Sequence, residues 1–346
     1  MEPDHAVVQR LLGVIVKAAQ STQTTDLEYA GLLDEASALL WYMKPDVAPL
    51  PLTTLKRYIM HFPLEHWLNE EARAGFTGML QTGGAASLLC DEILMELDPA
   101  KGWEQVQAIM LQIRDLCRNR EQGEQEYPVI RRFMVEHGMA DIDQSLDFLV
   151  PIGVGFTALF EPIPLHSQLD GQIYLCPSCG WPMRLDQQHV RCGAQWCWHH
   201  VGSFEWRDAG LVSARSTRVV EPRSVDNNYR LKTGLWKFTL VPGLLELNLL
   251  QRLTKLGLQP TLWPGVDKAD IRFVVGSEEI EIDAKVWASS TLLCDHLANL
   301  PARPLWIVIP DYQASHLQSL REACPKHVIV MTQTQCIRKA SKLCQR

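Results

Sequence analysis

The sequence predicts a multidomain chain of mixed α and β structure (α+β) in three consecutive parts. Residues 1–150 carry apolar side chains at helical spacing, residues 165–207 contain two cysteine pairs, and residues 208–346 alternate β-rich and helical runs. A chain of 346 residues with 47% hydrophobic content can bury more than one core. We therefore predict an all-helical N-terminal domain, a small cysteine module and a C-terminal α/β core with a mixed sheet.

The N-terminal part is predicted to be helical and chemically quiet. Five segments place apolar residues on one helical face, and prolines or the Gly83-Gly84 pair separate them. They span residues 7–19, 27–42, 52–67, 85–97 and 103–118. No P-loop, nucleophile elbow or HExxH motif occurs in the sequence, so we expect no catalytic site in this part.

Four cysteines form two close pairs in the second part. Cys176 and Cys179 belong to a CPSCG sequence, and Cys192 and Cys197 follow after a short gap. This pattern predicts a structural Zn²⁺ site of the zinc-ribbon or treble-clef type, closed to catalysis because four ligands fill it. The second pair has four intervening residues rather than two, so either that knuckle is enlarged or a histidine replaces Cys197 as fourth ligand. The candidate histidines are His199 and His200.

Aromatic and basic residues near the cysteines have two open roles: contact with nucleic acid or a partner, or packing of a small core. They are Trp181, Trp196, Trp198, Arg184 and Arg191. Residues 208–237 are predicted to be a basic linker, which either tracks a nucleic-acid backbone or carries ordinary solvated charges. Its basic residues, interleaved with Tyr229 and Trp236, are Arg215, Arg218, Arg223, Arg230, Lys232 and Lys237.

The third part contains a hairpin that brings charged residues together. Gly276-Ser277 is a turn signal between two β-rich runs, and folding there sets Asp270 opposite Asp283. Side chains alternate along the second run, so Asp283 and Lys285 share the face opposite its apolar residues. Such a face suits Mg²⁺ (or Mn²⁺) and phosphodiester hydrolysis, because the metal activates water and Lys285 assists the nucleophile or the transition state.

This arrangement resembles the signature of the PD-(D/E)XK, or restriction-endonuclease-like, nuclease superfamily. A preceding helix, 242–250, places Glu246 where that superfamily often carries a further metal ligand. Later runs complete the superfamily order α-β-β-α-β-α-β, with a helix around Leu292, Leu293 and Leu297, a strand at 305–309, a helix at 315–323 and a strand at 327–331. The resemblance implies that Asp270, Asp283 and Glu246 hold Mg²⁺ and that Lys285 is catalytic.

One departure concerns the proline of the signature, which does not directly precede Asp270. Pro264 lies earlier, and Asp267 after it is an alternative first carboxylate. Asp267 lies before the strand begins, and its hairpin partner would be Val286, so we favour Asp270.

Most of the chain is similar to the restriction-endonuclease-like (REase-like) protein of prokaryotic PIWI (pPIWI) RE three-gene islands. The residues that carry this resemblance are 244–247, 262–267, 270–272, 282–287 and 305–311, beside the helical N-terminal part and the CPxCG element. It implies a Mg²⁺-dependent DNA endonuclease of bacterial defence against phage or plasmid DNA, acting with a PIWI-like protein and a helicase. The alternatives are a catalytically silent scaffold that binds DNA or partners, and a transposon-associated endonuclease subunit.

The charge balance agrees with a nuclease that others direct to its target. A net charge of −7 is unlike that of a stand-alone DNA-binding protein, which is usually basic. We therefore expect local basic patches, metal ions or a partner to hold the DNA. No run is long enough for a membrane span, and the N-terminus lacks the regions of a signal peptide, so we expect a cytoplasmic location.

Overall fold

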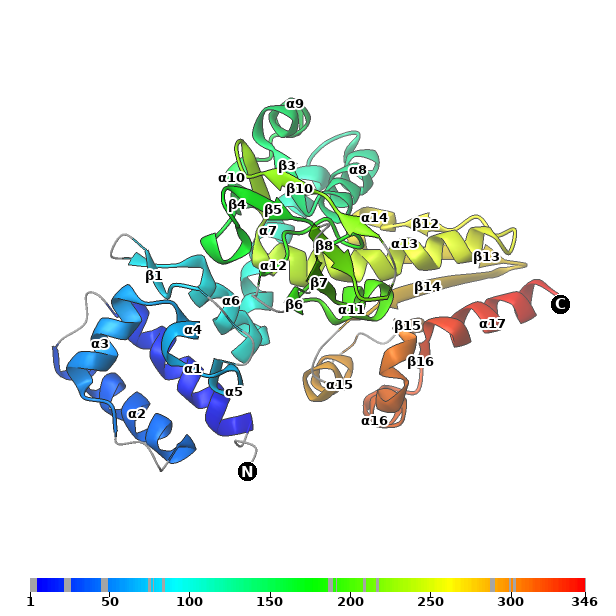
Figure 1. Cartoon of the computed structure of the whole chain (residues 1–346). Coiled ribbons are helices and arrows are strands. Elements are labelled where there is room, and N and C mark those ends of the chain that lie inside the picture. The colour runs from blue at the N-terminus through cyan, green and yellow to red at the C-terminus, as the bar shows by residue number, and fades with distance from the viewer. Residues whose placement is uncertain are drawn as a thin grey trace.

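The computed structural model describes residues 5–21, 26–44, 49–73, 76, 78–82, 85–185, 189–190, 192–207, 210–215, 218–286, 290–298, 300 and 303–345. Gly83, Gly84, Arg191 and the last residue of the range 282–287 lie outside these residues. The described residues form a mixed helical and sheet structure, as predicted (Figure 1). No helix among them combines the length and the apolar character that a membrane span requires.

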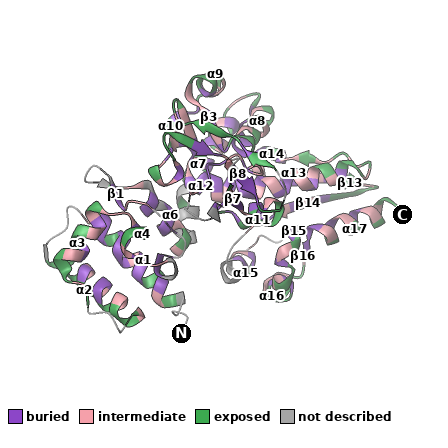
Figure 2. Ribbon diagram, in the orientation of Figure 1, coloured by how far each residue is buried: buried purple, intermediate pink, exposed green. Residues whose placement is uncertain are grey.

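The first hydrophobic core is built from the helices of roughly the first hundred residues. It is formed by α1 (His5–Gln20), α2 (Asp26–Met43), α3 (Leu52–His61), α4 (Leu64–Trp67), α5 (Glu70–Arg73) and α6 (Leu88–Leu97). A two-stranded sheet, β1 (Gln81–Thr82) and β2 (Ala85–Ala86), lies between α5 and α6. Leu11, Ile15, Leu55 and Ile59 are fully buried in this core, and Figure 2 shows α1 to α3 striped with buried and exposed residues. Helices α1 to α3 therefore bury one face each, whereas the helix predicted at 52–67 is divided into α3 and α4 and the one predicted at 85–97 begins only at Leu88, after β2.

Helices α7 (Pro99–Arg118) and α8 (Gly123–Glu136) belong to a second, larger core. Their buried residues Met110, Ile113, Ile130 and Met134 cluster with residues of the cysteine module and of the C-terminal sheet. A Cβ atom at Gly243 would collide with Val135, so α8 packs closely on the helix that contains Gly243. Amphipathic spacing predicted α7, at 103–118, but not α8, and it could not predict which surface the apolar face of α7 would cover.

The middle of the chain forms small sheets. Strand β11 (Asn228–Leu231) pairs with β3 (Met139–Asp141) and β4 (Phe160–Pro162), and β5 (Gln172–Tyr174) pairs with β10 (Pro222–Ser224). Helices α9 (Ile142–Ile152), α10 (Phe156–Leu159) and the short η1 (Leu165–Ser167) connect the early strands. A four-stranded sheet has the order β6 (His189–Val190), β7 (Phe204–Arg207), β8 (Gly210–Ser213) and β9 (Val219–Val220), with α11 (Gln195–Val201) between β6 and β7.

The basic linker predicted at 208–237 is therefore wrong. Strands β8 to β11, α12 (Thr233–Leu235) and the start of the π-helix η2 (Trp236–Leu240) lie in this range. Arg230 is fully buried there, because it forms ion pairs with Glu92 and Glu161. A buried, paired arginine cannot track a nucleic-acid backbone.

The C-terminal part has the predicted order of helices and strands. After α13 (Val241–Thr254) come β13 (Ile271–Val275), β14 (Glu278–Ala284), α15 (Ser290–Ala298), β15 (Leu305–Ile309), η3 (Asp311–His316), α16 (Leu317–Ala323) and β16 (Val328–Thr332). Four elements were not predicted: β12 (Thr261–Leu262), α14 (Pro264–Asp267), η3 and α17 (Gln333–Cys344). The sheet order is β12-β13-β14-β15-β16, antiparallel up to β14 and parallel after it, so the sheet is mixed as predicted.

Helices cover both faces of this sheet. Residues of α15 and α16 form one buried cluster with Leu305, Ile307 and Ile309, whereas α13 and α17 contribute to the larger core with Trp306 and Val308. Figure 1 shows α13 on one side of the strands and α15 and α16 on the other. All five residues of β15 are buried, as expected for a strand with helices on both faces.

Candidate active site and metal centre

The β13–β14 hairpin brings Asp270 and Asp283 together. Its register pairs Val275 with Glu278 across the Gly276-Ser277 turn, where Gly276 has a φ of +61°, and ends at Ile271 opposite Ile282. One step further, the backbone N–H of Asp270 donates to the carbonyl of Ile282 at 3.0 Å. The two aspartates therefore lie opposite each other at the end of the hairpin away from the turn.

The Asp270 carboxylate lies among other acids. Its Oδ2 accepts a hydrogen bond of 2.7 Å from the backbone N–H of Ala284. Burial raises the pKa of Asp270 well above its usual value, and the carboxylates of Glu246, Asp283 and Asp267 raise it further, against the effect of Lys285. The two aspartates at this end of the hairpin are oxygen donors of the kind that a hard divalent cation prefers, whereas no three of the acids bring their oxygens within 4.8 Å of one another among the described residues.

Lys285 carries the positive charge of the site. Its Nζ lies 3.6 Å from Oδ2 of Asp283, and its backbone N–H donates to the carbonyl of Val308 on β15 at 2.8 Å. Burial by itself would lower the pKa of Lys285, but the surrounding acids, Asp283 foremost and then Asp270, raise it above its usual value. The ammonium group is therefore charged at neutral pH and can donate to an anionic oxygen.

Glu246 lies on α13 and is only 1% exposed. Both of its oxygens have partners: Oε1 lies 3.2 Å from Nη2 of Arg131, and Oε2 accepts a hydrogen bond of 2.6 Å from Nε1 of Trp263. Burial raises the pKa of Glu246, while Arg131 and Trp263 counteract that shift. The structure thus places Glu246 beside the other acids but occupies it with protein donors.

Asp267, the alternative first carboxylate, is the last residue of α14. Its Oδ2 lies 3.7 Å from Nη1 of Arg114, and its Oδ1 is buried with no hydrogen-bond partner among the described residues. The structure pairs Asp270, and not Asp267, with Asp283 at the end of the hairpin.

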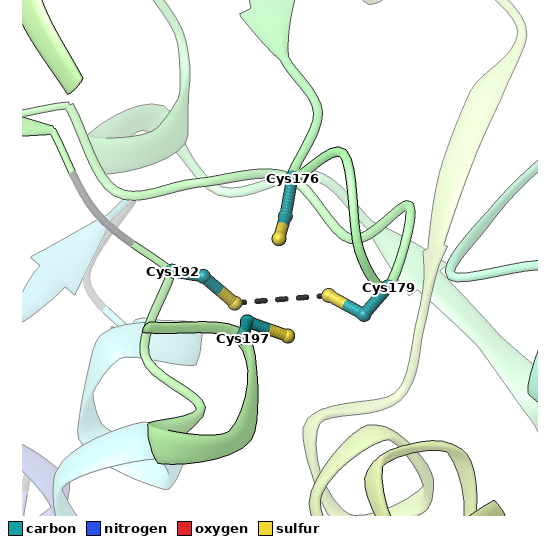
Figure 3. Close-up of side chains that lie close together, drawn as sticks. All are labelled: Cys176, Cys179, Cys192 and Cys197. Carbon is teal, nitrogen blue, oxygen red and sulfur yellow. Dashed lines mark hydrogen bonds between the residues drawn. The ribbon is translucent and has the colours of Figure 1, made fainter. Parts of the chain in front are cut away.

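Cys176, Cys179, Cys192 and Cys197 form the second candidate metal site. Their sulfur atoms all lie within 4.8 Å of one another, and Figure 3 shows the four side chains converging on a common centre. Sγ of Cys179 and Sγ of Cys192 are 3.7 Å apart. Tetrahedral Zn²⁺ with Zn–S bonds of about 2.3 Å separates its sulfurs by about 3.8 Å, so this spacing fits zinc. Hydrogen bonds from the other three thiols lower the pKa of Cys176.

The local fold explains how the cysteines converge. The backbone N–H of Gly180 donates to the carbonyl of Cys176 at 2.8 Å, and Gly180 has a φ of +68°, which favours glycine. Cys197 approaches from α11.

The two histidines considered as replacements for Cys197 contact other residues: His199 stacks on Tyr312 with ring centres 4.2 Å apart, and His200 stacks on Trp196. Among the described residues, the four cysteines are the one group of three or more candidate ligands within 4.8 Å.

Most aromatic and basic residues of the module pack inside the protein. Trp181 and Trp196 are buried, and Arg184 binds the buried Glu92 at 2.9 Å. Trp181 stacks on Trp236 of η2 at 4.2 Å and 11°. Of the three tryptophans, Trp198 is the exposed one, at 45%. The packing interpretation therefore holds for Trp181, Trp196 and Arg184.

Three residues near the acids were not predicted from the sequence. Arg131 gave no signal, because it lies on an amphipathic helix far before Glu246 in the sequence. Trp263 lay within a motif, but its role as a hydrogen-bond donor to Glu246 was not predicted. His296 lies on α15, where burial and the charge of Lys285 lower its pKa while Asp283 raises it.

Comparison with known proteins bears on the C-terminal part. Residues 243–346 match the pPIWI_RE_REase family model, described as REase associating with pPIWI_RE. The pPIWI_RE_REase match confirms the resemblance predicted from the sequence, and it includes Glu246, Asp270, Asp283 and Lys285. Helices α7 and α8 and the cysteine module lie outside the pPIWI_RE_REase match. No curated protein and no solved structure matches the chain.

Proposed function

We propose that this chain is a metal-dependent endonuclease that cleaves DNA phosphodiester bonds. The observation that carries the proposal is the pair Asp270 and Asp283, facing each other beside Lys285 within the region that matches an REase family. Asp270 and Asp283 would hold Mg²⁺ (or Mn²⁺), with Glu246 close by. When bound, such a metal activates water and offsets charge on the reacting phosphate.

The residues of the chain have separate tasks in this proposal. Asp270 is the carboxylate without a lysine or arginine partner among the described residues, so it is available to a cation. The hydrogen bond from Ala284 fixes the orientation of Asp270. Lys285, fixed through its own backbone to β15, places a charged donor where it can orient the nucleophile or stabilise the phosphate oxygens in the transition state.

The name of the family, which describes association with pPIWI_RE, supports the biological setting that we propose. We place the chain in a bacterial defence system against phage or plasmid DNA, acting in the cytoplasm with a PIWI-like protein and a helicase. The net charge of −7 supports targeting by partners, because an acidic chain gains little from phosphate neutralisation.

The four cysteines have a structural role in this proposal. They would hold one Zn²⁺ in a closed tetrahedral site, and metal binding would stabilise the small module that packs against η2 and, through it, α13.

A cleavage assay tests the nuclease proposal. Linear, circular and single-stranded DNA are incubated with the purified chain in Mg²⁺ or Mn²⁺, alone and with the suspected partners. We expect metal-dependent cleavage that Asp283→Ala abolishes. The matched control Glu279→Ala, at an exposed acid on the same hairpin, should retain it. Full activity of Asp283→Ala would sink the proposal. Binding of DNA without cleavage, with partners present, would favour the catalytically silent scaffold.

A further inference from the structure

Helices α7 and α8 reach the candidate active site from outside the matched residues 243–346. Arg131, on α8, is buried, and its ion pair with Glu246 spans 3.2 Å. Arg114, on α7, forms the ion pair with Asp267 at 3.7 Å. Four acids surround Lys285: Asp283, Asp270, Glu246 and Asp267. The last two form ion pairs with arginines that lie outside the family match.

A continuous series of hydrogen bonds connects Arg131 to Asp270. Arg131 donates to Oε1 of Glu246, and Nε1 of Trp263 donates to Oε2 of the same carboxylate at 2.6 Å. The backbone N–H of Trp263 then donates to the carbonyl of Asp270 at 2.9 Å. Asp270 is thus bound on its carbonyl side by Trp263 and on its carboxylate side by Ala284.

The turn between Trp263 and Asp270 has strained backbone. Trp263, Val266 and Asp267 have φ values of +47°, +55° and +72°. A β-branched residue such as valine rarely adopts positive φ, and such strain persists where the surrounding structure holds it. Here α14 packs against both α7 and α8, and the Arg131 guanidinium lies 5.7 Å from the centre of the buried Trp263 ring. The two helices therefore hold the turn that leads into Asp270.

The same contacts keep Glu246 away from a metal ion. If Glu246 turned toward a cation, it would leave the buried guanidinium of Arg131 and the indole N–H of Trp263 without a partner. Uncompensated buried charges and donors are strongly destabilising. Asp270 and Asp283 are held by fewer contacts: Asp270 accepts one hydrogen bond from the backbone N–H of Ala284, and Asp283 lies 3.6 Å from Nζ of Lys285.

We infer that Arg131 and Trp263 are positioning residues of the nuclease centre: they hold Glu246 as a support rather than a metal ligand and fix the turn that presents Asp270. The functional nuclease unit then includes α7 and α8 besides residues 243–346. This inference rests on the proposed function. It assigns Asp270 and Asp283 as the metal ligands and Glu246 as a carboxylate that holds the surrounding residues in place.

The test measures Mn²⁺ affinity by titration calorimetry and cleavage kinetics on the full chain. The variants are Trp263→Phe, which removes the indole donor without changing charge, and Arg131→Lys, which keeps the charge but loses the guanidinium fork. Each is expected to lower Mn²⁺ affinity and kcat by roughly 10- to 100-fold, with KM for DNA unchanged, because support of a metal ligand is lost. The matched control is Arg132→Lys, an exposed neighbour on α8 paired with Glu136, which is expected to behave as the wild type.

Two results would overturn the inference. If Glu246 is itself a ligand, the two variants release it, and they bind Mn²⁺ as tightly as the wild type or more tightly. If the contacts only stabilise the fold, thermal unfolding shifts downward while Mn²⁺ affinity and kcat of the folded variants stay unchanged. Asp283→Asn separates this outcome from failure of the proposed function. If Asp283→Asn binds Mn²⁺ as tightly as the wild type, the metal site itself is contradicted. If Asp283→Asn loses Mn²⁺ affinity but Trp263→Phe and Arg131→Lys keep it, this inference alone is contradicted.

Discussion

The guanidinium of Arg230 lies 2.5 Å from the carboxylate of Glu92, although 138 residues separate the two in the sequence. Arg184 and His166 bind the same carboxylate at 2.9 and 3.1 Å, and all four side chains are largely buried. Glu92 belongs to α6, Arg230 to β11, and Arg184 to the cysteine module. One acid therefore joins the N-terminal helices to the rest of the protein.

Removal of this acid should be costly. Glu92→Ala removes the buried partner of Arg184 and His166 and leaves Glu161 as the acid paired with Arg230, and breaking a buried ion pair from one side typically costs about 3–5 kcal/mol. We expect a loss of that order in the free energy of unfolding, measured by urea denaturation. The matched control is Glu96→Ala on the same helix, whose pair with Lys237 is 58% exposed on the acid side and should cost less than about 1 kcal/mol. Equal effects of the two variants would contradict the assignment.

The Glu92 network also predicts how stability depends on pH. Burial alone would raise the pKa of Glu92, but Arg184, His166 and Arg230 hold it well below its usual 4.5. An acid with a lowered pKa in the folded state contributes stability above its unfolded pKa, and this contribution is lost as pH falls through the folded value. Unfolding followed between about pH 6 and pH 3 should therefore show a decline below pH 4.5 that Glu92→Gln reduces. An unchanged profile in Glu92→Gln would be inconsistent with this network.

The cysteine site predicts a metal count. The purified chain should contain one Zn²⁺, measured by plasma emission spectrometry, and Cys176→Ser should lose it and unfold at lower temperature. Cys344→Ser, a change at an exposed cysteine outside the cluster, is the control that should keep the metal. Near-zero zinc in the wild type with all thiols reduced would remove the site.

The stack of Trp181 on Trp236 predicts an energetic link between the cysteine module and the helices before α13. The rings are parallel within 11° at 4.2 Å, and Trp181 also donates from Nε1 to the carbonyl of Leu231 at 2.9 Å. A double-mutant cycle with Trp181→Leu and Trp236→Leu should give a coupling of about 0.5–1.5 kcal/mol in unfolding free energy. Strict additivity would show that the two rings do not stabilise each other.

The sequence predicted the hairpin well because strand register has few alternatives. A Gly-Ser turn and an apolar side chain at every second position fix which residues face each other, and a slip of one residue would expose Ile280 and Ile282. The later strands were predicted for a related reason. Short apolar runs such as 305–309 are buried on both faces, so their composition alone marks them as strands.

The residues that complete the site could not be predicted in the same way. The periodicity of α8 marks its apolar face, but it does not say that Arg131 meets Glu246, 115 residues away. Arg230 was misassigned because arginine is usually exposed, and its burial depends on Glu92 and Glu161, acids distant in sequence. Contacts between charged residues far apart in the sequence leave no local pattern.

The central claim is that Asp270 and Asp283 share a divalent metal ion. Equilibrium dialysis of the full chain against Mn²⁺, with Zn²⁺ retained at the cysteines, measures this most directly. The Asp270→Asn/Asp283→Asn double variant should bind at least one Mn²⁺ fewer than the wild type at the same free concentration. The control Glu278→Gln/Glu279→Gln, at the exposed tip of the same hairpin, should bind as the wild type does. Equal Mn²⁺ binding by the wild type and the double aspartate variant would contradict the claim.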